Sequence, residues 1–166
     1  MPHNMKPIHY LILLPLLAIM MVSCETKSQS SPRLTAASKV VRTDSAGVND
    51  TISLSDSINV GDTIRLRIML EGVYNTLTSL QVKSDTTCLL TAIEKDWDEE
   101  SDAYLADGTD AEHGKLVFVP EKVYGWISTL RYAAVKSGAH TIDFTLSSSA
   151  GEGYSPRSFT LNVNVR

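Results

Sequence analysis

The sequence is poor in cysteine, histidine and aromatic residues, and each shortage removes a class of protein. It has only two cysteines, Cys24 and Cys88, which excludes a disulfide-rich scaffold. Its four histidines show no spacing typical of a zinc site. A phosphate-binding glycine loop, a dinucleotide fingerprint and a Gly-x-Ser-x-Gly elbow are all missing. We therefore expect a protein that is not an enzyme and needs no cofactor.

Positive charge and long apolar runs are also scarce. Lysine and arginine number 15 against 19 aspartate and glutamate residues, and the formal net charge is −4. This acidic balance argues against nucleic acid as a partner and against electrostatic adhesion to anionic lipid. The longest apolar run, residues 10–22, falls short of the about 20 residues that a membrane-spanning helix needs.

What the N-terminus does contain is the pattern of a secretory signal. Lys6 precedes the apolar run, and the small residue Ser23 follows it. With Cys24 directly after Ser23, the segment resembles the lipobox of bacterial lipoproteins. The resemblance implies that residues 1–23 are removed and that Cys24 is acylated, for example with palmitate. The alternative is ordinary signal cleavage nearby, which would leave Cys24 as a plain thiol.

The lipobox resemblance also implies a location. Glu25 and Thr26 follow Cys24, and the absence of aspartate after the cysteine resembles outer-membrane sorting. We therefore expect a lipid-anchored protein of the cell envelope, held in the outer membrane on a face that the sequence leaves open. If Cys24 carries lipid, Cys88 has no intramolecular partner, and its apolar neighbours favour a buried, unreactive thiol.

Residues 24–49 are expected to form the lipidated cysteine and a flexible tether. The stretch Ser28–Pro32 is polar and rich in breakers, and no sustained apolar period follows it. Such a segment does not bury enough surface to offset the entropy of ordering it.

Residues 50–166 change to the period-two alternation of half-buried strands. Apolar residues alternate with polar ones over 64–70, 142–146 and 159–165, and glycine-containing or polar turns separate the runs. No convincing helix follows the signal, and residues 121–128 are the only helix-like stretch. We predict an all-β domain, an antiparallel sandwich of about seven to nine strands.

Two resemblances refine this fold. The last two predicted strands, 140–146 and 159–165, resemble the final pair of an immunoglobulin-like domain, and Tyr132 two residues before Ala134 resembles the tyrosine-cysteine spacing of its penultimate core strand. The plan of lipobox, tether and one such domain is similar to small lipoproteins encoded on conjugative transposons. The residues that carry this similarity are Gly61-Asp62-Thr63, Leu130-Arg131-Tyr132 and Thr141-Ile142-Asp143-Phe144. Neither resemblance implies an active site.

An acidic stretch between residues 94 and 112 is a candidate calcium loop. Five of its carboxylates fall at positions 1, 3, 5, 7 and 12 of a calcium-loop spacing: Asp96, Asp98, Glu100, Asp102 and Asp107. Ser101 stands where such a loop needs glycine, and position 12 lacks the bidentate glutamate. The alternative is a solvated loop that keeps a sheet edge soluble.

Four aromatic residues lie in or beside the predicted long loops: Trp97, Tyr104, Tyr124 and Trp126. Aromatic side chains on loops stack on sugars or anchor a protein partner. The alternative is that they cap the open end of the sandwich core.

We expect a membrane-anchored, non-enzymatic binding or accessory module of the cell envelope, for example in a conjugation, secretion or uptake assembly. Its partners would be the membrane, through the anchor, and an envelope protein. The alternative is a lipoprotein that binds carbohydrate or calcium through the loops around Trp97 and Trp126. The sequence leaves the oligomeric state open.

Overall fold

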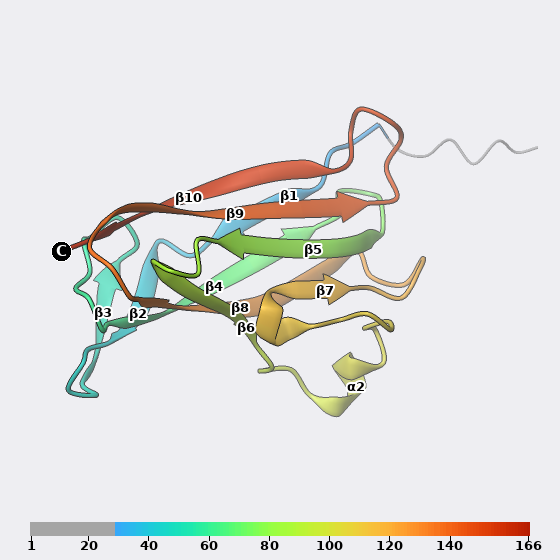
Figure 1. The fold of residues 1–166 in the computed structure, drawn as a ribbon. Coiled ribbons are helices and arrows are strands. Elements are labelled where there is room, and N and C mark those ends of the chain that lie inside the picture. The colour runs from blue at the N-terminus through green and yellow to red at the C-terminus, as the bar shows by residue number, and fades with distance from the viewer. Residues whose placement is uncertain (1–28) are drawn as a thin grey trace, which may run out of the picture.

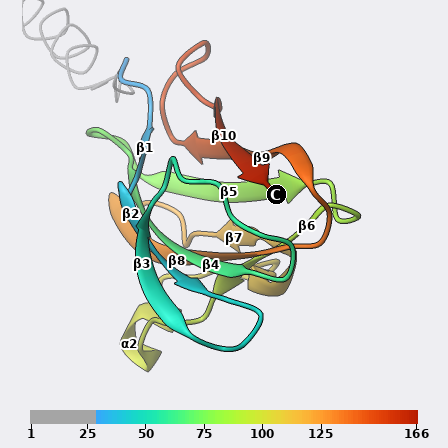
Figure 2. The same cartoon turned by 90° about the vertical axis from the view of Figure 1, so that its left-hand side faces the viewer.

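The computed structural model describes residues 29–166, which form two packed antiparallel sheets (Figures 1 and 2). The first sheet contains β1 (Arg33–Ala36), β2 (Lys39–Thr43), β3 (Asn49–Ser53), β4 (Thr63–Glu71), β6 (Leu89–Glu94) and β8 (Gly125–Ala134). The second contains β5 (Leu77–Ser84), β7 (Lys115–Val117), β9 (Gly138–Ser148) and β10 (Arg157–Val165). Two single helical turns, α2 (Glu99–Asp102) and the 3₁₀ turn η1 (Ala111–His113), lie between β6 and β7.

The strand order confirms the predicted all-β sandwich. The first sheet runs β3-β2-β4-β8-β6, with β1 also paired to β4, and the second runs β10-β9-β5-β7. The series β1-β4-β8-β6 facing β10-β9-β5 reproduces the four-plus-three pairing of immunoglobulin constant-type domains. The β2–β3 hairpin and β7 are additions to that plan, so the described part of the chain has more strands than the sequence predicts.

Alternation along the strands builds the core. Ile64, Leu66, Ile68 and Leu70 of β4 are fully buried, and Leu66 lies opposite Leu130 of β8 in the register. Burying a side chain of this size contributes about 1.5–3 kcal/mol relative to leaving it in water. The residues between them face outward. One of these is Arg65, whose Nε lies 2.8 Å from Oε1 of Glu94 on β6.

The predicted tether is wrong for residues 33–49. β1 pairs with the second half of β4 and β2 with its first half, and Val40 is 97% buried. The nine-residue strand β4 has an edge long enough to pair with both strands, and this pairing stabilises them. The apolar alternation within β1 and β2 is too short for either strand to be recognised from the sequence. The sandwich therefore begins at Arg33. The predicted signal peptide 1–23 and the acylated Cys24 lie outside the described residues.

Two local predictions also fail. The helix-like stretch 121–128 is a loop followed by the start of β8, because Trp126 and Ser128 alternate inward on a strand. Tyr132 is buried, but it lies on β8 and not on the penultimate strand β9. The resemblance to the immunoglobulin tyrosine therefore does not extend to its position.

Candidate functional site

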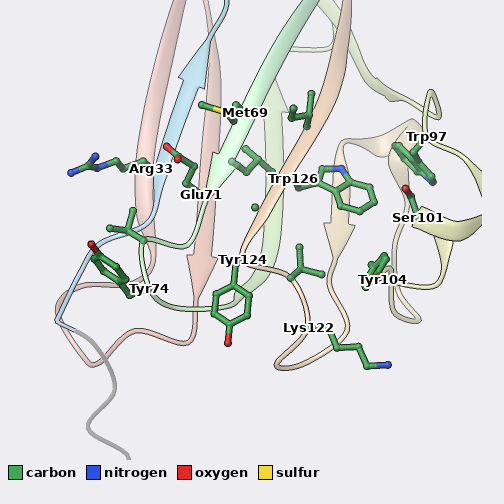
Figure 3. Close-up of a pocket in the computed structure, with 15 residues that line it drawn as sticks. Arg33, Met69, Glu71, Tyr74, Trp97, Ser101, Tyr104, Lys122, Tyr124 and Trp126 are labelled. Carbon is green, nitrogen blue, oxygen red and sulfur yellow. The ribbon is translucent and has the colours of Figure 1, made fainter.

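A wide groove of about 1090 Å³ opens at the end of the sandwich where β4 ends and β8 begins (Figure 3). Side chains from β1, β4, the β4–β5 turn, the α2 segment, the loop before β8 and β8 itself line it. These residues are Arg33, Met69, Leu70, Glu71, Val73, Tyr74, Trp97, Ser101, Tyr104, Lys122, Val123, Tyr124, Gly125, Trp126 and Ile127. The groove therefore collects side chains from segments that are far apart in the sequence.

All four aromatic residues singled out from the sequence line this groove. Trp126 is 91% buried and forms its inner wall, with its ring 5.7 Å from that of Trp97 and 5.6 Å from that of Phe118. Tyr104 and Tyr124 are 41% and 61% exposed and stand at its rim. Trp126 thus packs on the core, as the capping alternative predicts, while Tyr104 and Tyr124 face solvent.

Trp97 is held in place by the acidic segment. Its indole Nε1 donates to Asp102 at 2.7 Å, and Lys95 Nζ lies 3.0 Å from the same carboxylate. These two contacts, the Trp97 hydrogen bond first, lower the pKa of Asp102. Asp98 caps the α2 turn by accepting from the Ser101 N–H at 2.8 Å, which lowers the pKa of Asp98.

The five carboxylates of the candidate calcium loop are not brought together. Asp98 and Asp102 have the local roles just described, and Asp96 accepts from the Thr129 hydroxyl on β8. Glu100 and Asp107 are exposed. Within residues 29–166, no group of three or more histidine, cysteine, aspartate or glutamate side chains is placed to hold a metal ion. The acidic residues instead shape the loop that carries Trp97.

Next to the aromatic wall, the outer face of the first sheet contributes apolar side chains. Met69 on β4 lies opposite Ile127 on β8, and they are 40% and 51% exposed. The alternation over 64–70 is consistent with an outward Met69, but it does not show which residue lies beside it. The signal that identifies such a pair is a large apolar residue at an outward position of an alternating strand.

Charged residues at the groove have no partners of their own. Arg33 lies opposite Glu71 in the β1–β4 register, and Lys122 precedes the buried Val123. The hydrogen bonds and ion pairs found among the described residues involve none of the three charged side chains. Arg33 was missed because the sequence assigned it to the tether.

Trp126 carries a buried polar group without a partner. Its indole N–H is buried and has no hydrogen-bond partner in the described part of the protein, a condition shared there only with the Ser128 hydroxyl. A buried donor left unpaired costs about 1–3 kcal/mol, and such a group is rare in native proteins. Because the nitrogen itself is closed off from solvent, the groove meets the ring of Trp126 and not its N–H.

The other candidate chemistry lies away from the groove. Cys88 is a free, buried thiol whose Sγ is 3.5 Å from an Asp85 carboxylate oxygen. His113 pairs with Asp110 at 2.8 Å on an exposed turn, an arrangement that raises the pKa of His113 and lowers that of Asp110. His140 contacts the Lys136 carbonyl at 2.8 Å. Cys88 and His140 both lie near Asp85, whose pKa is lowered by hydrogen bonds from Thr87 first, then by Cys88 and by the charge of His140.

No helix within residues 29–166 is both long and apolar enough to cross a bilayer.

Comparison with known proteins does not assign this chain to a family. No protein-family model matches the chain, and neither does any curated protein. Among solved structures, the sandwich is similar to domains 4 and 5 of the S-layer protein SbsC, with 19% identity and a TM-score of 0.41 over 81% of this chain and 53% of that one. This chain therefore spans about half the length of the SbsC structure.

Two further structures are similar. A conjugate transposon protein from Bacteroides vulgatus has 15% identity and a TM-score of 0.42 over 87% of this chain and 92% of that one. The collagen-binding domain from a Staphylococcus aureus adhesin has 11% identity and a TM-score of 0.36 over 61% and 87%. The likeness in each case is one of β-sandwich fold.

Proposed function

We propose that the protein is a lipid-anchored, non-enzymatic binding module of the cell envelope, and that its groove takes a segment of a partner protein. The observation that carries this proposal is the convergence of Trp97, Tyr104, Tyr124 and Trp126 on one open groove. These residues come from two separate segments, 97–104 and 124–126, and form a surface that the stability of the sandwich alone does not require.

The composition of the groove favours a protein as the ligand. Tryptophan, tyrosine, methionine and arginine are enriched in protein interfaces, and tryptophan, tyrosine and arginine dominate their binding energy. The groove combines all four, with Met69 beside the aromatic wall and Arg33 at the opposite rim. Unpaired charges of both signs, Arg33 and Glu71, are able to pair with a polar segment that passes over them.

One observation supports a binding role over catalysis. Glu71 is the single carboxylate among the groove's lining residues, which include no histidine or cysteine. Catalytic groups typically lie within hydrogen-bond reach of each other, and no hydrogen bond or ion pair among the described residues joins the side chains of Glu71, Ser101 and Lys122. The anchor is the acylated Cys24 implied by the lipobox, and we place the protein in the outer membrane, where it would serve an envelope assembly.

The proposal is tested by site-specific photo-crosslinking in the native cell envelope. A photo-crosslinking residue in place of Ile127, which is 51% exposed in the groove, should yield a discrete protein adduct. The matched control replaces Leu90, which is 54% exposed on β6 outside the groove. The Ile127 adduct should weaken when Trp97 is changed to Ala. Identical adducts from both positions, or none from Ile127, would refute the proposal.

A carbohydrate ligand is the second candidate, favoured by the exposed rings of Tyr104 and Tyr124 in the groove. Aromatic faces of this kind stack on sugars. Tryptophan emission, titrated against a glycan panel, separates the two candidates, because a saturable change with a glycan favours this one. Calcium is not carried forward, since the carboxylates that suggested it are dispersed.

A further inference from the structure

We propose that the groove end of the sandwich rests on the bilayer that holds the anchor, with Tyr74 and Tyr124 at the level of the lipid headgroups. This inference rests on the lipid anchor of the proposed function. It adds an orientation of the domain and a second contact with the membrane, made by the folded domain itself.

The chain enters the fold at the groove end. The Asn75 side-chain amide, 96% buried, donates to the Ser30 carbonyl at 3.0 Å, and Arg157 Nε donates to the Ser31 hydroxyl at 2.9 Å. β1 then starts at Arg33, opposite Glu71 at the end of β4. In Figure 1 this end lies opposite the C-terminus. The position of residue 30 is thus fixed to the turn that carries Tyr74.

The covalent distance to the anchor is short. Five residues lie between Cys24 and Ser30. A fully extended chain covers at most about 3.3–3.6 Å per residue, so the six steps from Cys24 to Ser30 span about 20 Å. The ten-residue strand β8 alone is about 33 Å long. With Cys24 at the membrane surface, the groove end stays near the bilayer, while the far end of the strands points away from it.

The surface at the groove end suits a membrane interface. Tyr74 is 86% exposed at the tip of the β4–β5 turn, Tyr124 is 61% exposed in the neighbouring loop, and Tyr154 is half-buried in the β9–β10 loop. Tyrosine favours the headgroup region because its ring is apolar and its hydroxyl is polar. In the turns at the opposite end, the large exposed apolar side chains are Val48, Val60 and Val135, without an aromatic ring.

Charge at this end is acidic once the α2 segment that lines the groove is included, so the contact would not come from attraction to anionic lipid. Four positive residues, at positions 33, 95, 122 and 157, stand against eight acidic residues, at positions 71, 96, 98, 99, 100, 102, 121 and 152. The tyrosines, and not an electrostatic attraction, would therefore orient the domain. A groove held at this height would receive a partner segment that runs along the membrane surface.

The test places a reporter at each end of the full-length, acylated protein in vesicles of phosphatidylethanolamine and phosphatidylglycerol. Lys122→Cys marks the groove end and Val48→Cys the opposite end, each labelled with a thiol-reactive fluorophore. The acylated Cys24 has no free thiol, and the chain without an added cysteine gives the background from the buried Cys88. A nitroxide on the lipid headgroups should quench the Lys122 label severalfold and leave the Val48 label unchanged.

The tyrosines are then tested directly. Tyr74→Ser with Tyr124→Ser, in the Lys122→Cys chain, should remove most of the quenching while the protein still floats with the vesicles. Equal quenching at both ends, or quenching that survives the double substitution, overturns the inference and leaves the anchor intact. A protein that does not float with the vesicles overturns the anchor and this inference together.

Discussion

The two ends of the sandwich differ in where backbone strain is placed. Val73 (φ 50°), Tyr74 (φ 70°) and Glu121 (φ 62°) are the non-glycine residues with positive φ in the described part of the chain, and all lie in the two loops that border the groove. At the opposite end the positive φ values belong to Gly47, Gly61 and Gly138, for which this conformation has little steric cost.

Hydrogen bonding does not separate the two ends. At the opposite end, Asp62 accepts from the Asn59 N–H at 2.8 Å. At the groove end, Asn75 donates to the Ser30 carbonyl at 3.0 Å, and Asp98 accepts from the Ser101 N–H at 2.8 Å. Backbone strain concentrates where proteins bind or react. The positive φ values of non-glycine residues therefore point to the groove end independently of its aromatic composition.

The largest effect is expected at the β4–β5 turn. A Cβ at Gly72 would lie 1.8 Å from the Asn75 carbonyl oxygen, so Gly72→Ala should destabilise the fold by about 3 kcal/mol. Gly151→Ala is the matched control on a neighbouring loop, because its Cβ meets nothing within 4 Å. Urea unfolding of both variants measures the difference. Equal midpoints would show that the turn tolerates the added atom and that the groove end is less constrained than described.

The opposite end should lose stability when its buried turn carboxylate is removed. Asp62 is 98% buried, accepts from Asn59 and lies 3.8 Å from Arg42, so Asp62→Ala should cost about 2 kcal/mol. Asp50→Ala removes only the exposed partner of Arg42 and should cost less than about 1 kcal/mol. Thermal unfolding followed by circular dichroism tests the ranking, and a reversed order would contradict it.

A valine-to-glycine substitution should change the free energy of unfolding in opposite directions at the two ends. Val73→Gly removes a β-branched residue from positive φ and should stabilise the protein by up to about 1 kcal/mol. Val48→Gly, in a turn of ordinary φ, should destabilise it slightly through the entropy of the unfolded chain. Denaturant midpoints decide the signs. Destabilisation by Val73→Gly would mean that its side-chain contacts outweigh the strain.

The smallest effect is expected in the pH dependence of the contact between Asp102 and Trp97 in the groove wall. The pKa of Asp102 is lowered in the folded protein, so the stabilisation from its charge is complete above the ordinary aspartate value of about 3.9 and is lost as the pH falls through the lowered value. Trp97 emission should therefore change only below about pH 4. Asp102→Asn keeps an oxygen acceptor and should show no such step, and a step near neutral pH would exclude Asp102 as its cause.

Alternation along the chain was enough to predict the core strands and the sandwich. A strand with one face in water must alternate. β4 does so over its full length, and β9 and β10 do so after their first two residues. β1 and β2 could not be predicted, because what stabilises them is the edge of β4, which is distant in sequence. The resemblance at Tyr132 failed for a related reason: spacing within a strand does not identify which strand it is.

The site was predictable by residue type but not by arrangement. Trp97, Tyr104, Tyr124 and Trp126 were identified individually, yet their shared groove depends on how β8 and the α2 segment meet in the fold. The acidic residues that suggested calcium serve local structure: Asp98 caps α2 and Asp102 holds Trp97. Arg33 reaches the groove through the β1–β4 register, which no local pattern reveals.

The hydrogen bond from Asn75 to the Ser30 carbonyl has a mechanical consequence. Tension applied to the chain before residue 30 would load this bond and the Arg157–Ser31 contact first, and then the four residue pairs of β1 and β4. Because Arg33 begins β1, peeling that strand would take one wall of the groove with it. A protein pulled from its N-terminus would therefore lose the shape of its groove long before its core unfolded.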